Sequence, residues 1–449
     1  METIRLQNPF DIKKITLTIA VIELFYLLLL IKSTTLSILF MLLICGSFVL
    51  YVVPEFGFAI PFTINILLYY LFDFIQVPIS MPAFRSYLLI FFASIMIYHI
   101  KSNKEKDFEM NHFFWVAILI GFILMAGIPY SANKYYGAKK FVFYFIVNIP
   151  MLYAAYLLKD NKKSMEKLIA SILFIGIVMA IISFFTAQSN IFFKFVRFRL
   201  SESIGPLYIG RSLGLSIVAA LYFFARFKRI APKIIFGIAI IILFMPIIWS
   251  GSRGPTLGVM LSILLFYYLQ PSQSRGKKIF FTALFFLAGI YYLFHSSTQV
   301  AARMATPIGA EASAAFRVLA WIQAVHQFIG SPLLGIGTGS FYLETTFIPL
   351  VYPHNLLLEL ACENGIFGLA IIIYFLYLAT NQGRKNIHLY AKKKEHVQLQ
   401  LSIAALTFFF FSLWNSMFSG DIYANAIVWW PAGLIWALQK KESPLQEAK

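Results

Sequence analysis

The chain has 449 residues, of which 60% are hydrophobic and only 12% are charged, and its formal net charge is +18. Apolar runs recur from end to end, and a run of about 20 residues is the length that a helix needs to cross a hydrocarbon core of about 30 Å. We therefore predict an all-α polytopic membrane protein and exclude a transmembrane barrel, whose strands of about 10 residues would alternate in polarity.

About fourteen transmembrane helices, with twelve as the lower bound, are predicted in a single integral membrane domain that covers residues 1–449. The predicted spans, in chain order, are 15–31, 34–53, 57–77, 84–100, 112–131, 138–158, 167–186, 209–225, 234–250, 255–270, 279–295, 356–381, 397–417 and 425–439.

Lysine and arginine accumulate in the short cytoplasmic loops of membrane proteins. Here they cluster between alternate spans, for example in "KSNKEK" from residue 101, "KDNKKSMEK" from 159 and "RKNIHLYAKKK" from 384. Fourteen spans with both termini in the cytoplasm place every such cluster on the cytoplasmic face. The positive charge therefore reflects topology and attraction to anionic membrane lipids, and it gives no reason to expect nucleic acid as a partner.

The sequence offers no ligand set for a metal ion or a nucleotide. Cys45 and Cys362 both fall within apolar spans, and no CxxC, HExxH, Walker-type loop or DxD pair is present. We expect no cofactor and no metal, so the energy for any reaction must arrive with the substrate.

Three segments on the predicted outer face carry arginine or histidine. Residues 193–214 contain Arg199 and Arg211, residues 249–258 contain Arg253, and the long extracytoplasmic loop 296–354 contains Arg317 and His354. All three segments are predicted to lie on the same side of the membrane, which is the first indication of a functional site.

Arg253 lies in "SGSRGPTLG", where small residues precede Pro255 at the start of a predicted helix. Free backbone N–H groups at a helix N-terminus, together with a guanidinium, suit a phosphate or diphosphate. The alternative is an ordinary capped turn with an arginine that reaches the membrane surface.

The long loop contains an amphipathic helix over 311–330, which we expect to lie at the membrane interface with Arg317 and Trp321 one turn apart. The glycine-rich stretch 335–339 follows it. Since no strand precedes these glycines, they favour a flexible turn over a phosphate-binding loop.

The stretch "YPHNLLLELACENGIFGLA", residues 352–370, places Asn355, Glu359 and Glu363 along one helix face, with His354 at its mouth. Charged groups in a span usually face the bundle interior, so we expect both glutamates to pair with arginines or to order the polar groups of a site. Asn355 is expected to cap this helix, and His354 is either a cap or a base. Further along, Gly365 and Gly368 predict a close helix crossing.

These blocks, "SGSRGPTLG", "FRVLAWIQAVHQFIGSPLLGIGTGSF" and "PHNLLLELACENGIFGLA", resemble the C-terminal signature of the O-antigen ligase and Wzy-type polymerase superfamily of bacterial envelope glycosyltransferases. The ligase-like spacing of His-Asn, nine residues, Gly, two residues, Gly is met by His354, Asn355, Gly365 and Gly368. The resemblance defines a signature region over 187–375.

The resemblance implies an enzyme of the bacterial inner membrane with its site on the periplasmic or extracellular side. The donor would be a polyprenyl-diphosphate-linked glycan and the acceptor a hydroxyl of a glycan or lipid. By similarity, Arg253 and Arg317 would hold the donor diphosphate, Arg211 and Arg199 would add donor contacts, and His354 would act on the acceptor hydroxyl. Asn355, Glu359 and Glu363 would support them.

Three interpretations of the function follow. The large span count and the spacing from Arg199 to Gly210 favour a polysaccharide polymerase, whereas the His-Asn block favours a ligase that transfers the polymer to a lipid such as lipid A-core. We favour the polymerase. A lipid-linked glycan transporter is the third reading, but transporters place ionisable residues near the midplane of repeated halves, and here the charges gather at one rim.

Overall fold

The computed structural model describes residues 48–59, 82–102, 112–190, 206–271, isolated positions between 276 and 291, 312–345 and 349–440. The predicted spans 15–31, most of 34–53 and of 57–77, and much of 279–295 lie outside the described residues, and so does Arg199.

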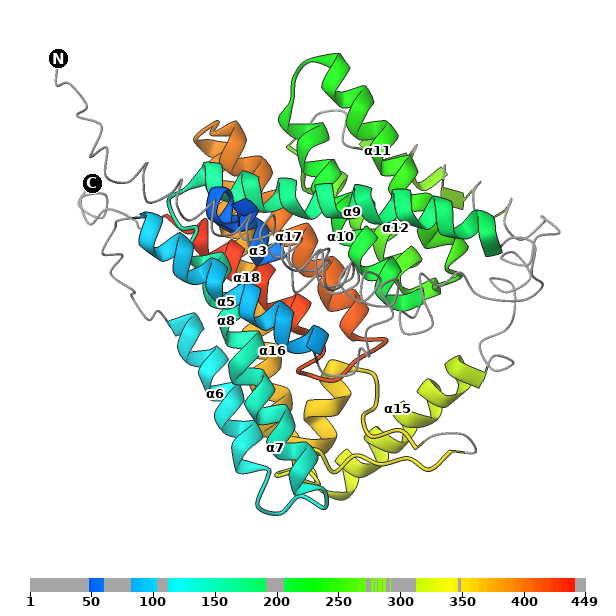
Figure 1. Ribbon diagram of the computed structural model, residues 1–449. Coiled ribbons are helices and arrows are strands. Elements are labelled where there is room, and N and C mark those ends of the chain that lie inside the picture. Colours follow the sequence, from blue (N-terminus) through cyan, green and yellow to red (C-terminus); the bar gives the residue numbers. More distant parts are fainter. Residues whose placement is uncertain are drawn as a thin grey trace, which may run out of the picture.

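The described part of the chain is helical, and an isolated antiparallel bridge between Leu343 and Leu350 is its only extended pairing (Figure 1). The helices are α3 (Pro54–Ala59), α5 (Pro82–Ser102), α6 (His112–Ala126), α7 (Lys134–Phe143), the π-helix η2 (Tyr144–Asn148), α8 (Ile149–Tyr156), α9 (Lys162–Asn190), α10 (Pro206–Arg226), α11 (Ile230–Trp249), α12 (Arg253–Leu269), α15 (Ala312–Gly330), α16 (Leu356–Lys392), α17 (His396–Ser416), the 3-10 helix η4 (Ala426–Val428) and α18 (Trp429–Ala437).

Five of the described helices, α9, α10, α11, α16 and α17, are long and apolar enough to cross a membrane. This confirms the prediction of a helical protein with several apolar spans. The total of fourteen spans and the cytoplasmic position of both termini stay predictions.

Helices α10 and α17 lie at the centre of the bundle. Their apolar windows are each 78% buried, against 22% for α11, which lies at the periphery. Small residues permit close packing around them: a Cβ on Gly210 of α10 would lie 2.7 Å from Pro255 at the start of α12. The N-termini of α10 and α12 therefore lie together.

Two predicted spans are interrupted helices. The span 138–158 consists of α7, η2 and α8, and the wide π turn at Tyr144–Asn148 ends two residues before Pro150. Helix α16 is kinked at Gly365, whose φ of 64° is left-handed. A Cβ there would lie 2.2 Å from the carbonyl oxygen of Leu333. The expected helix crossing at Gly365 is therefore wrong, because this glycine permits a kink against a loop.

The loops assigned to one side of the membrane meet at one end of the described bundle. Tyr136 Oη donates to Asp421 Oδ2 at 2.5 Å, and Trp414 Nε1 donates to Gly254 O at 2.9 Å. At the other end, Gln270 and Gln400 exchange amide hydrogen bonds of 2.9 Å. The structure thus groups these loops together, and which end faces the cytoplasm stays a prediction.

Candidate functional site

Helix α15 lies against the first turns of α16 (Figure 1). Ala320 and Ala324 are buried there beside Phe341 and Cys362, because alanine lets the two helices approach. On the opposite side of α15, Val318, Leu319, Ile322, Val325 and Ile329 are exposed. The helix predicted over 311–330 is confirmed, and its outward apolar face suits a membrane interface.

The glycine-rich loop after α15 is packed against its neighbours. Gly335, Gly337 and Gly339 all have positive φ. Every backbone N–H from Gly335 to Ser340 donates within the protein, with acceptors on Ser331, Cys362, Glu363, Gly127, the Glu363 carboxylate and Gly337 in that order. Because all of these N–H groups donate within the protein, none is left to bind a phosphate. The loop is also tightly packed, so the flexible turn that we expected is wrong.

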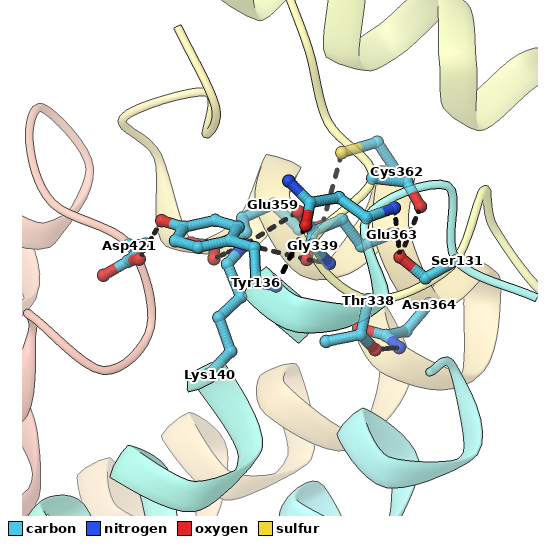
Figure 2. Close-up of polar contacts among 12 residues, drawn as sticks. Ser131, Tyr136, Lys140, Thr338, Gly339, Glu359, Cys362, Glu363, Asn364 and Asp421 are labelled. Carbon is cyan, nitrogen blue, oxygen red and sulfur yellow. Dashed lines mark hydrogen bonds and ion pairs between the residues drawn. The ribbon is translucent and has the colours of Figure 1, made fainter. Parts of the chain in front are cut away.

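Lys140 of α7 lies at the centre of a buried ionic cluster (Figure 2). Its Nζ is 2.7 Å from Glu359 Oε1, and it donates to both oxygens of Glu363 at 2.7 and 2.9 Å. The side chains are at most 1% exposed. Both glutamates are therefore buried and paired as expected, but their partner is a lysine of α7 and the arginine pairing is wrong.

Glu363 also binds the loop, since its Oε2 accepts the N–H of Gly339 at 2.9 Å. Beside it, Asn364 Nδ2 donates to Thr338 Oγ1 at 2.8 Å (Figure 2). Thr338 Oγ1 in turn donates to Leu124 O at 2.7 Å. The cluster thereby joins α6, α7, the glycine-rich loop and α16.

Sequence reasoning missed Lys140, Tyr136 and Asp421. The available signal was the pair of carboxylates on α16, because two buried acids need a cation. Lys140 lies near the start of an apolar run, a position where lysines commonly extend to the membrane surface, and nothing in the local pattern separates the two cases.

Asn355 is the N-cap of α16, as predicted, and its Oδ1 accepts from the N–H groups of Leu357 and Leu358 at 3.1 Å. His354 precedes it with a left-handed φ of 59°. Its ring centroid is 4.4 Å from that of Tyr352. Its buried Nδ1 has no hydrogen-bond partner among the described residues.

Burial, and then the charges of Arg317 and Arg211, lower the pKa of His354 to about 4. The imidazole is therefore neutral at neutral pH and can accept a proton. The same electrostatic influence shows that two of the predicted arginines lie near this histidine.

Arg211 is buried on α10, and its Nη2 donates to the carbonyl oxygens of Asn415 and Ser419 at 2.7 and 2.8 Å. It thus fastens the end of α17, where a cation also complements the helix dipole. This nitrogen is engaged in holding the fold.

Arg253 is the first residue of α12 and is connected to α15 through aromatic side chains. Trp414, which donates to Gly254 O, packs on Phe418 with centroids 5.1 Å apart. Phe418 in turn lies 5.9 Å from Trp321, one helical turn after Arg317. The structure therefore gathers Arg211, Arg253, Arg317 and His354 around the end of α17.

Lys140→Met should destabilise the protein by about 3–5 kcal/mol, because it leaves two buried carboxylates without their cation. Thermal denaturation of the purified protein in detergent would measure this, with the exposed Lys134→Met as control. Adding Glu359→Gln and Glu363→Gln to Lys140→Met should recover part of the loss. Equal melting temperatures for Lys140→Met and Lys134→Met would contradict the structural role of the cluster.

Comparison with known proteins agrees with the resemblance noted in the sequence. Residues 238–373 match the family model described as O-antigen ligase. Over 283 residues the chain is 25% identical to a protein of Rickettsia prowazekii (strain Madrid E) named "Putative polysaccharide ligase RP358". That match covers 59% of this chain and 65% of the Rickettsia protein, so the chain spans slightly less than two thirds of this relative.

The family match covers α12, α15 and the first half of α16, which are the elements that carry Arg253, Arg317 and His354. Lys140, Arg211 and Asp421 come from outside it and complete the same end of the bundle. Both comparisons support a relationship between the chain and the O-antigen ligase superfamily.

Proposed function

We propose that this protein is a membrane glycosyltransferase that moves a glycan from a polyprenyl diphosphate to an acceptor hydroxyl on the extracytoplasmic face of the bacterial inner membrane. The observation that carries the proposal is a neutral, half-buried His354 within the electrostatic reach of Arg317 and Arg211, inside the segment that matches the ligase family.

Arg253 and Arg317 hold the donor diphosphate in this proposal. A guanidinium offers two parallel N–H donors, which fit the paired oxygens of a phosphate, and Arg253 also lies at the N-terminus of α12. Negative charge grows on the leaving diphosphate during transfer, and fixed cations stabilise it. Arg211 adds positive charge from its position at the end of α17. Arg199 is a further candidate for donor contact.

His354 acts on the acceptor. As the acceptor oxygen bonds to the anomeric carbon, the bond from that carbon to the diphosphate oxygen breaks, and the electron pair leaves with the polyprenyl diphosphate. The acceptor proton passes to the neutral imidazole. The diphosphate is already an activated leaving group, so the proposed reaction uses neither a nucleotide nor a metal ion.

The depth of the site fits a lipid-linked donor. The exposed apolar face of α15 suits the boundary between lipid tails and head groups, and Arg317 lies on the same helix. The diphosphate of a polyprenyl carrier occupies that boundary, between the lipid tail and the sugar.

Ligase and polymerase share this chemistry and differ in the acceptor. The description of the matching family and the name of the Rickettsia protein both favour a ligase. The features that favour a polymerase, the span count and Arg199, include residues outside the described part of the chain. We therefore place the ligase first and retain the polymerase as the second candidate.

Deleting the gene should separate the two candidates. Loss of a ligase strands full-length polymer on the lipid carrier, whereas loss of a polymerase leaves a single repeat unit on the final acceptor. Gel profiles of the lipid-linked and mature glycans would measure this. Unchanged glycans on both sides of the membrane would contradict both candidates, and lipid-linked glycan retained in the cytoplasmic leaflet would indicate a transporter.

Arg253→Lys should remain strongly impaired although it keeps the charge, because an ammonium cannot reproduce the two-pronged geometry of a guanidinium. The measurement is donor binding by the purified variant.

His354→Ala should leave donor binding intact and lower turnover by about 10²–10⁴-fold, the range for a positioned base. Donor binding and single-turnover transfer by the purified variant measure these two effects. Wild-type rates in His354→Ala would return this histidine to a purely structural role.

The pH dependence should reflect the low pKa of His354. The neutral imidazole is the active form, so kcat/KM should hold as the pH falls to about 5 and decline as it passes through about 4, the pKa in the free protein. Bound diphosphate favours the imidazolium, so the acid limb of kcat should lie at higher pH than that of kcat/KM. An acid limb of kcat/KM near the ordinary histidine pKa of about 6.5 would contradict this assignment.

A further inference from the structure

Tyr136, Tyr352 and Tyr423 lie around one buried carboxylate, Asp421, in the loop after α17, and Tyr208 lies beside Tyr352 and Tyr423. Tyr136 comes from α7, Tyr208 from α10, Tyr352 from the segment before α16, and Tyr423 from the same loop as Asp421. Asp421 is only 1% exposed and influences Tyr136, Tyr352 and Tyr423 electrostatically. We call these four side chains the tyrosine cluster.

Asp421 organises the cluster through two hydrogen bonds. Its Oδ2 accepts from the hydroxyl of Tyr136 at 2.5 Å (Figure 2). Its Oδ1 accepts from the N–H of Ala424 at 3.0 Å. The second bond closes the turn that carries Tyr423. The carboxylate therefore fixes one tyrosine directly and another through its own loop.

Tyr208, Tyr352 and the hydroxyl of Tyr423 are open to a ligand, whereas the ring of Tyr423 already packs on Phe143, with centroids 5.3 Å apart. Tyr208 is 56% exposed, and Tyr352 and Tyr423 are half-buried. Within the described residues, the hydroxyls of these three tyrosines have no hydrogen-bond partner. Burial, followed by the charge of Asp421, raises the pKa of Tyr352 to about 12, so this phenol stays a hydrogen-bond donor at physiological pH.

The cluster adjoins the groups assigned to transfer. The ring of Tyr352 packs on His354, and Tyr208 precedes Arg211 by three positions on α10, which puts both on one side of that helix. Tyr208 and Tyr352 both interact electrostatically with Arg211. A molecule lying on the tyrosines would therefore meet the histidine.

The chemistry of the cluster differs from that of the arginines. Asp421 repels a diphosphate, while tyrosine rings offer flat apolar faces edged by hydroxyls. A sugar ring has the complementary form, with apolar C–H faces and a rim of hydroxyls. Pockets that combine aromatic side chains with a few polar groups are typical ligand sites.

We propose that Tyr136, Tyr208, Tyr352 and Tyr423 form a saccharide subsite that holds the acceptor sugar next to His354. The word acceptor rests on the proposed function, whereas the binding of a saccharide rests on the cluster itself. The subsite is specific for glycan and separate from the arginines that bind the diphosphate.

The probe for the test is an oligosaccharide of a few repeat units, released by mild acid from the envelope polysaccharide of the host strain and labelled at its reducing end. Binding is measured with the full-length purified protein. Tyr208→Leu and Tyr423→Leu should each weaken binding by about tenfold through loss of aromatic contact and hydroxyl. The matched control is Tyr135→Leu, because Tyr135 neighbours Tyr136 but is 84% exposed and outside the cluster.

Undecaprenyl diphosphate is the second probe, and its affinity should be unchanged in all of these variants, which also verifies that they are folded. Tyr208→Phe and Tyr423→Phe keep the ring and remove only the hydroxyl, so they carry the test if a leucine variant fails to fold. They should weaken oligosaccharide binding less than leucine does.

The proposal is overturned if the wild-type protein does not bind the oligosaccharide, or if both cluster variants bind it as tightly as Tyr135→Leu. Transfer assays separate this result from the proposed function. A protein that transfers glycan with an unchanged acceptor KM in the cluster variants keeps the transferase function and refutes the subsite. If the protein binds the oligosaccharide through the tyrosines but transfers no glycan, the subsite is supported and the transferase function is refuted.

Discussion

The ion pairs between Lys140 and the two glutamates of α16 are the interaction on which this end of the molecule depends. Breaking a buried charge cluster by removing one partner costs several kcal/mol, so the three side chains hold their elements in one arrangement. Glu359 and Glu363 lie on the first two turns after His354, and Glu363 also takes an N–H from the glycine-rich loop that follows α15. One lysine thus fixes the helix mouth at His354 relative to the helix that carries Arg317.

The charges at this end are arranged in two layers. Lys140 and its carboxylates are buried in the packed interior, while Arg211, Arg253 and Arg317 gather around the end of α17 beside His354. The carboxylates of Glu359 and Glu363 pair with Lys140, so they do not take up the charge of the arginines at the rim. A lipid-linked diphosphate would complete that balance of charge in the proposed reaction.

Local patterns predicted the helices and their caps well. Helix α15, the Asn355 cap and the burial of Glu359 and Glu363 followed from periodicity and from the cost of charge in an apolar helix. The partner of the glutamates did not, because Lys140 and Glu363 are 223 positions apart and a single sequence carries no sign of that contact. Gly365 was misread for a related reason: a glycine that permits close packing and one that permits positive φ look the same in sequence.

The glycine-rich loop, whose backbone N–H groups are all used internally, has a consequence for product release. Apart from the first turn of α12, anion capture at this end would depend on long arginine side chains, because the glycine-rich loop offers no free amides. Ordering an arginine side chain costs up to about 2 kcal/mol of conformational entropy, which lowers its affinity for an anion. In the proposed reaction this lower affinity is useful, because the carrier lipid must dissociate after every transfer. Weaker binding of its diphosphate shortens the residence time of the product.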